Sequence, residues 1–169
     1  MNPMRMLYDM RTIKQMLTDA ERISREMGEE EPAAEHLLLS ALGLSDGSAT
    51  RAMAAVGVDA EGIRTALRQE QAEALVSVGV PRDTAEAMAE PAPLGPGSAP
   101  LLYAAGPSAR EVFQEAGRLA RSSKQRLAGA HVVVAVAALE RGTLPRVLER
   151  LTVDRQRLAD AARAELAVR

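Results

Sequence analysis

An internal repeat is the feature that most constrains the fold of this 169-residue chain. Residues of the first half recur in the second half at a nearly constant distance. His36, Met53, Val58, Asp59 and Ile63 recur 95 positions later as His131, Leu148, Val153, Asp154 and Leu158, and Leu17 and Ala20 recur 96 positions later as Phe113 and Ala116. Such self-similarity predicts two copies of one structural unit that share a core.

Each copy carries the spacing of amphipathic helices. Ile13, Met16, Leu17 and Ala20 follow the i, i+3, i+4, i+7 pattern of a half-buried helix. Aromatic residues make up only 2% of the chain, so Ala, Leu, Val and Met supply most of the apolar surface and favour helices over strands. We therefore predict an all-α fold with about eight helices, arranged as two tandem pseudo-symmetric four-helix repeats that pack back to back.

A Pro- and Gly-rich segment separates the two copies. It spans residues 79–106 and leaves room for one short helix at 82–89. We predict a first repeat at 1–78, a linker at 79–106 and a second repeat at 107–169, together forming one compact domain. At the start of the second repeat, Ser108 and Glu111 have the spacing of a helix capping box.

Charge and apolar patterning exclude several classes of partner. The net charge of −2 and the pI near 5.8 give no global attraction for nucleic acid or anionic membranes. No apolar run approaches the length of a membrane span, and residues 1–11 lack the apolar core of a secretory signal. We expect a cytoplasmic protein. One possible function is that of a small helical regulator that binds nucleic acid, through Arg118, Arg121, Lys124 and Arg126, or another regulatory protein.

No set of residues points to catalysis. The chain has no cysteine, no phosphate-binding loop and no HExxH metal motif. Its two histidines, His36 and His131, stand at matching repeat positions before apolar runs, where they are expected to hydrogen-bond locally at helix starts. We predict that the protein is not an enzyme and needs neither a metal nor a cofactor.

The first repeat resembles the N-terminal domain of Clp-family unfoldases. Residues 35–39, preceded by a helix ending at Met27 and Gly28, are similar to the family's Gly-Thr-Glu-His-Ile-Leu-Leu signature. Residues 52–59 resemble the segment that leads to the family's fourth helix, and Gly106-Pro107 resembles the Thr-Pro that begins its second unit. The resemblance covers most of residues 9–78 and 105–168 and is degenerate in the second repeat.

The resemblance implies a binding function. In the family this domain precedes ATPase rings and receives substrates, adaptors or inhibitory cyclic peptides. A stand-alone chain of this kind is expected to be a monomer that binds protein or peptide ligands, such as a Clp unfoldase, its clients or cyclic-peptide inhibitors. It would act as an adaptor or a decoy in Clp-dependent proteolysis. The family's ligand groove matches Met6, Leu17, Leu102, Ala105, Arg110 and Gln114, with Tyr103 adjacent.

Two further surfaces have alternative interpretations. Glu35 matches a carboxylate that pairs with phosphorylated arginine in some family members, although Ala34 and Ala130 replace other residues of that site. It could instead be a first-turn acid that complements the helix dipole. Met1, Met4, Met6 and Met10 form either a flexible surface for varied apolar partners or a packed N-terminus.

Overall fold

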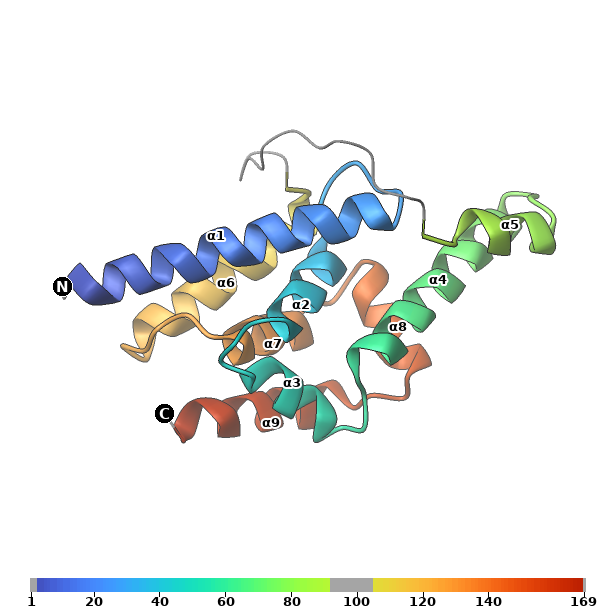
Figure 1. Cartoon of the computed structure of the whole chain (residues 1–169). Coiled ribbons are helices and arrows are strands. Elements are labelled where there is room, and N and C mark those ends of the chain that lie inside the picture. Colours follow the sequence, from blue (N-terminus) through green and yellow to red (C-terminus); the bar gives the residue numbers. More distant parts are fainter. Residues whose placement is uncertain (1–2, 92–104, 169) are drawn as a thin grey trace.

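Nine α-helices and no β-strand form the regular structure of residues 3–91 and 105–168, the part described by a computed structural model (Figure 1). Side chains are described from Tyr8 onwards. The helices are α1 (Pro3–Glu26), α2 (Ala34–Leu42), α3 (Ser48–Ala54), α4 (Ala60–Ser77), α5 (Arg82–Met88), α6 (Pro107–Ser122), α7 (Gly129–Ala137), α8 (Thr143–Arg150) and α9 (Arg155–Ala167). The prediction of an all-α fold is confirmed.

Local sequence explains most helix boundaries. Gly28 follows the end of α1 with a φ of 76°, a left-handed conformation that glycine adopts without strain. Asp59 caps α4, since its Oδ1 accepts a hydrogen bond of 2.8 Å from the Gly62 nitrogen. Asp154 caps α9 in the same way, with bonds of 2.8 and 3.1 Å from the nitrogens of Gln156 and Arg157. The repeated Val-Asp therefore marks the start of the fourth helix in both repeats.

The capping box expected at Ser108 is not formed. The N-cap of α6 is Gly106, which has no side chain that could cap the helix. The Ser108 hydroxyl instead accepts a hydrogen bond of 3.1 Å from the backbone nitrogen of Ala34, in the first repeat. The prediction was wrong because α2 lies close enough to use this hydroxyl, a long-range contact that spacing within α6 cannot report.

The recurring histidines and most of the recurring apolar residues occupy equivalent buried positions. Both histidines, the Met53–Leu148 pair and the Ile63–Leu158 pair are at most 1% exposed, and Val58 and Val153 are both 8% exposed. Ala20 and Ala116 are buried as well. Burial at matching positions explains why the pattern is shared, because each copy supplies the same residues to the core.

The two repeats interlock instead of packing back to back as expected. The second helices, α2 and α7, pack against each other, and α1 and α6 pack on α2 and α7 respectively. The fourth helices reach across the molecule: α4 packs on α8 of the second repeat, and α9 packs on α3 of the first (Figure 1). Neither repeat can bury its third helix without the other.

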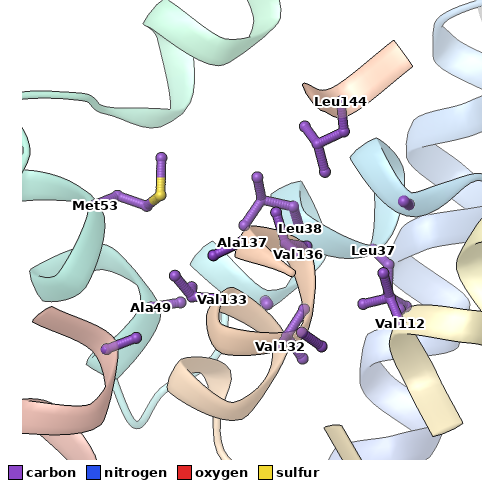
Figure 2. Close-up of a cluster of buried hydrophobic side chains, with 14 of the residues drawn as sticks. Leu37, Leu38, Ala49, Met53, Val112, Val132, Val133, Val136, Ala137 and Leu144 are labelled. Carbon is purple, nitrogen blue, oxygen red and sulfur yellow. The ribbon is translucent and has the colours of Figure 1, made fainter. Parts of the chain in front are cut away.

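One continuous apolar core connects the repeats. Figure 2 shows Leu37 and Leu38 of α2 among Val132, Val133 and Val136 of α7. The cluster also includes Ala49 and Met53 of α3, Val112 of α6 and Leu144 of α8. β-Branched valines lower the intrinsic helix propensity of α7, so its burial within the core stabilises this helix.

The short helix expected in the linker is present as α5. It packs on the end of α4 through a separate small cluster of Ala72, Ala85 and Ala89. Residues 92–104 lie outside the described part of the chain. Along residues 3–91 and 105–168, no helix combines the length and apolar character needed to span a bilayer.

Candidate functional site

A groove between α6 and α7 is the strongest candidate for a binding site. Its cavity volume is about 860 Å³. One wall is the polar face of α6, with Arg110, Gln114, Arg118 and Arg121 at helical spacing. The opposite side is formed by Ala135 at the end of α7 and by Ala138 and Leu139, which directly follow this helix; of these three residues only Ala138 is exposed. This arrangement follows from the sequence of α6, because Ala109, Val112, Ala116 and Ala120 turn into the core and leave the polar residues outside.

Ion pairing within the groove distinguishes its arginines. Arg118 donates two hydrogen bonds to the Glu115 carboxylate, at 2.7 and 2.6 Å. These bonds lower the pKa of Glu115 and raise the pKa of Arg118. The Arg110 Nε donates to the carbonyl oxygen of Ala105 at 2.6 Å, which leaves its two terminal nitrogens for other partners. The charge of Arg118 is thus already matched, whereas Arg110 has no carboxylate partner within residues 3–91 and 105–168.

Arg121 lies back along α6. A Cβ placed on Gly117, one turn earlier, would be 3.2 Å from the Arg121 Nη1. Glycine at this position therefore leaves room for the guanidinium group to follow the helix surface beside the groove. Arg121 is exposed and forms no ion pair with the described residues.

The structure brings some of the predicted groove residues together. Arg110 and Gln114 line the groove, and Ala105 is buried and supplies the carbonyl that holds Arg110. Leu17 is half-buried on α1 and packs against the core instead of lining this groove. The side chain of Met6, together with Leu102 and Tyr103, lies outside the described residues. Their assignment to a ligand site stays a prediction.

Sequence reasoning missed the contribution of α7. Ala135, Ala138 and Leu139 belong to an apolar run whose spacing predicts only a buried helix. The sequence analysis predicts a basic helix surface that includes Arg118 and Arg121, but it does not predict the pairing of Arg118 with Glu115. The i, i+3 spacing of Glu115 and Arg118 was the available signal.

The start of α2 holds a second group of ionisable residues. Gln71 of α4 donates a hydrogen bond of 2.7 Å to Glu29, whose other carboxylate oxygen is 3.9 Å from the His36 Nε2. Burial raises the pKa of Glu29. His36 is fully buried, and its Nδ1 accepts a hydrogen bond of 2.8 Å from the Ala33 nitrogen. Burial lowers the pKa of His36 to about 4, so its imidazole is neutral at physiological pH.

The histidine prediction is confirmed in both repeats. The Nδ1 of His131 accepts a hydrogen bond of 3.1 Å from the Ala128 nitrogen, the counterpart of the bond between His36 and Ala33. Each histidine thus supports the first turn of the second helix in its repeat. Among the residues that the structure describes, no group of three or more histidine, aspartate or glutamate side chains could hold a metal ion.

Glu35 lies in the first turn of α2, as expected, but its carboxyl group is buried. The residue is only 5% exposed, and burial raises its pKa to about 7. Near neutral pH the group is therefore partly protonated, which weakens any interaction with the helix dipole. A ligand such as phosphorylated arginine could reach this carboxylate only after local movement. Recognition of phosphoarginine stays a prediction.

Exposed methionine occurs at the N-terminal helix. Met10 is 60% exposed on α1, whereas Met1 and the side chains of Met4 and Met6 are outside the described part of the chain. The structure therefore shows one of the four methionines as accessible apolar surface.

Comparisons with known proteins agree with the helical repeat. Residues 11–91 match the sequence profile of the family described as the Clp repeat (R) N-terminal domain. The fold is similar to the crystal structure of the N-terminal domain of the caseinolytic protease associated chaperone ClpD from Arabidopsis thaliana. That match has a TM-score of 0.55 and 19% identity and covers 92% of this chain and 94% of the other. No curated protein sequence matches the chain.

Proposed function

Because residues 11–91 belong to the Clp repeat N-terminal domain family, we propose that this protein is a non-catalytic module that binds polypeptide segments for Clp-dependent proteolysis. It acts either as an adaptor that presents ligands to a Clp unfoldase or as a decoy that withholds them. The observation that supports this proposal is the groove between α6 and α7, which lies beside a packed double repeat. It combines small apolar surface with arginines that form no ion pair among the residues described by the structure.

The groove has the character of a polypeptide site. Its volume of about 860 Å³ is open to solvent and can accept several residues of an extended chain. Ala135 and Ala138 present no bulky side chain, so a ligand backbone can approach α7 closely. The walls belong to helices fixed by the core, so the site is largely formed before a ligand arrives.

Binding of an unfolded protein tests the proposal directly. Fluorescein-labelled, reduced and carboxymethylated α-lactalbumin should bind the purified chain, and native α-lactalbumin should not. Ala138→Trp would fill the groove, because Ala138 is an exposed residue that lines it. Ala164→Trp places the same side chain at an exposed position of α9 and serves as the control. Equal affinity of the two variants would exclude the groove as the site.

Proteolysis assays separate the two roles. With a Clp unfoldase and its protease from the same source, an adaptor should accelerate degradation of the bound polypeptide, and a decoy should slow it. The Ala138→Trp variant should lose either effect, whereas Ala164→Trp should keep it. Unchanged degradation with the wild-type chain at saturating concentration would contradict both roles.

A further inference from the structure

Charge is distributed unequally between the two repeats. Residues 1–91 contain sixteen Asp and Glu against nine Lys and Arg, whereas residues 105–168 contain seven Asp and Glu against eleven Lys and Arg. The small net charge of the whole chain hides this difference. The groove between α6 and α7 therefore belongs to a basic repeat, although the protein is acidic overall.

Two guanidinium groups beside this groove lack a carboxylate partner among the described residues. Arg110 uses only its Nε, to reach the Ala105 carbonyl, and Arg121 forms no ion pair. Arg118 is neutralised by Glu115. Arginine pairs with carboxylates in a forked geometry, and pairs of this kind gain strength when apolar surface nearby excludes water.

Resting on the function proposed above, we infer that the groove recognises acidic polypeptide segments, with Arg110 and Arg121 each pairing with a carboxylate of the ligand. The two arginines are eleven residues apart on α6, which corresponds to roughly 16 Å along a helix axis. An extended peptide advances about 3.3 Å per residue, so the best ligands carry Asp or Glu about five positions apart. The residues between them are small or apolar and lie over the exposed Ala138.

A peptide fits the charges of the groove better than a nucleic acid does. Glu111 and Glu115 line the same wall as the arginines. A nucleic acid carries a charge at every phosphate, so some phosphates would lie beside these carboxylates. A peptide can place its acids at Arg110 and Arg121 only and present neutral residues to Glu111.

Matched peptides test the inference on the full chain. The probe is a fluorescein-labelled twelve-residue peptide with two Glu residues five positions apart in an Ala, Leu and Ser background, and the control peptide has Gln in place of both Glu. Fluorescence anisotropy should show at least tenfold tighter binding of the Glu peptide in 50 mM NaCl. This preference should shrink in 300 mM NaCl because salt screens exposed charges.

Arginine variants identify the contacts. Arg121→Gln should reduce the preference for the Glu peptide at least threefold, and the double variant Arg110→Gln/Arg121→Gln should abolish it. Substitution of Arg110 also removes its hydrogen bond to the Ala105 carbonyl and so changes the local structure. The single Arg121→Gln variant keeps this bond and therefore tests the charge contact alone. Arg157→Gln removes an exposed arginine of α9 outside the groove and should leave binding unchanged.

The other outcomes would overturn the inference in distinguishable ways. Equal binding of the Glu and Gln peptides would remove the acidic preference but leave the proposed polypeptide-binding function intact. Failure of both peptides and of unfolded α-lactalbumin to bind would contradict the function itself. Tighter binding of a twelve-nucleotide single-stranded DNA would reassign the groove to nucleic acid. A dimer in sedimentation that Arg121→Gln dissociates would assign it to a second copy of the chain.

Discussion

The hydroxyl oxygen of Ser48 in α3 accepts a hydrogen bond of 2.8 Å from the backbone nitrogen of Ala130 in α7, which joins the first repeat to the second. Asp46, in the loop before α3, accepts a further bond of 3.1 Å from the Gly129 nitrogen. In the other direction, Ser108 of the second repeat accepts the bond from Ala34 at the start of α2. Each repeat thus caps the second helix of the other.

Ser48→Ala should therefore weaken the whole fold. The substitution leaves the buried nitrogen of Ala130 without its acceptor, which costs about 1–3 kcal/mol of unfolding free energy. Urea unfolding followed by circular dichroism measures the change. Ser45→Ala alters an exposed serine three residues earlier and should change stability by less than about 0.5 kcal/mol. A Ser48→Ala variant as stable as this control would show that the cap contributes little.

Gly129 should tolerate no side chain, because α7 begins close against the first repeat. A Cβ at this position would lie 2.8 Å from the Ala49 Cβ and 3.1 Å from the Ala41 carbonyl oxygen. Gly129→Ala should cost about 1–3 kcal/mol in urea unfolding, since these atoms belong to packed helices that cannot easily move.

A second helical glycine provides the contrast. A Cβ at Gly117 would meet only the flexible end of Arg121, so Gly117→Ala should be neutral or stabilise α6 by up to about 1 kcal/mol. Equal losses of stability in the two variants would show that the contact at Gly129 is not the cause.

Glu35 should make stability fall as the pH rises from 4.5 to about 7. Its pKa is about 7 in the folded protein and near 4.5 when exposed, so the folded state binds more protons between these values. This contribution is complete below pH 4.5 and is lost as the pH rises through 7. Glu35→Gln removes the ionisation and should be more stable than wild type at pH 8, by on the order of 2–3 kcal/mol.

The advantage of Glu35→Gln should disappear as the pH falls below 4.5, where the wild-type carboxyl becomes protonated in both the folded and the unfolded state. Urea unfolding at a series of pH values measures the difference. Glu30→Gln, at an exposed position of the same segment, should follow the wild-type curve. If the unfolding free energies of Glu35→Gln and wild type change in parallel with pH, then folding does not raise the pKa of Glu35.

His36 should have the opposite effect on stability over nearly the same pH range. Its pKa is about 4 in the folded protein and near 6.5 when exposed, so the unfolded state binds the extra proton and stability falls as the pH drops from 6.5 to 4. The Asn side chain of His36→Asn can still accept a hydrogen bond from the Ala33 nitrogen, but it does not titrate. The unfolding free energy of this variant should therefore change less between pH 6.5 and pH 4 than that of wild type, whatever its value at pH 8.

Ser40→Ala is a suitable control for this slope. It removes a buried hydrogen bond of 2.7 Å from the Ser40 hydroxyl to the Met16 carbonyl and should lower stability without changing its pH dependence. If the stability of His36→Asn falls as steeply between pH 6.5 and pH 4 as that of Ser40→Ala, His36 is ruled out as the titrating group.

The sequence by itself determined the helices and their duplication. Apolar spacing within a helix reports which residues share a face, so the stripe on α1 and the recurring buried positions could be predicted. Asp59, Asp154 and the two histidines act on backbone groups only two or three residues away, and their roles are visible in a local pattern.

Tertiary structure alone decided how the two repeats meet and what chemistry their surfaces have. The crossing of α4 and α9 to the opposite repeat, the caps supplied by Ser48 and Ser108, and the contribution of α7 to the groove all join residues distant in the chain. Burial of the Glu35 carboxyl is likewise a property of the folded chain that local spacing does not report. Periodicity fixes the face on which a side chain lies, but solvent exposure and pKa depend on which other helix covers that face.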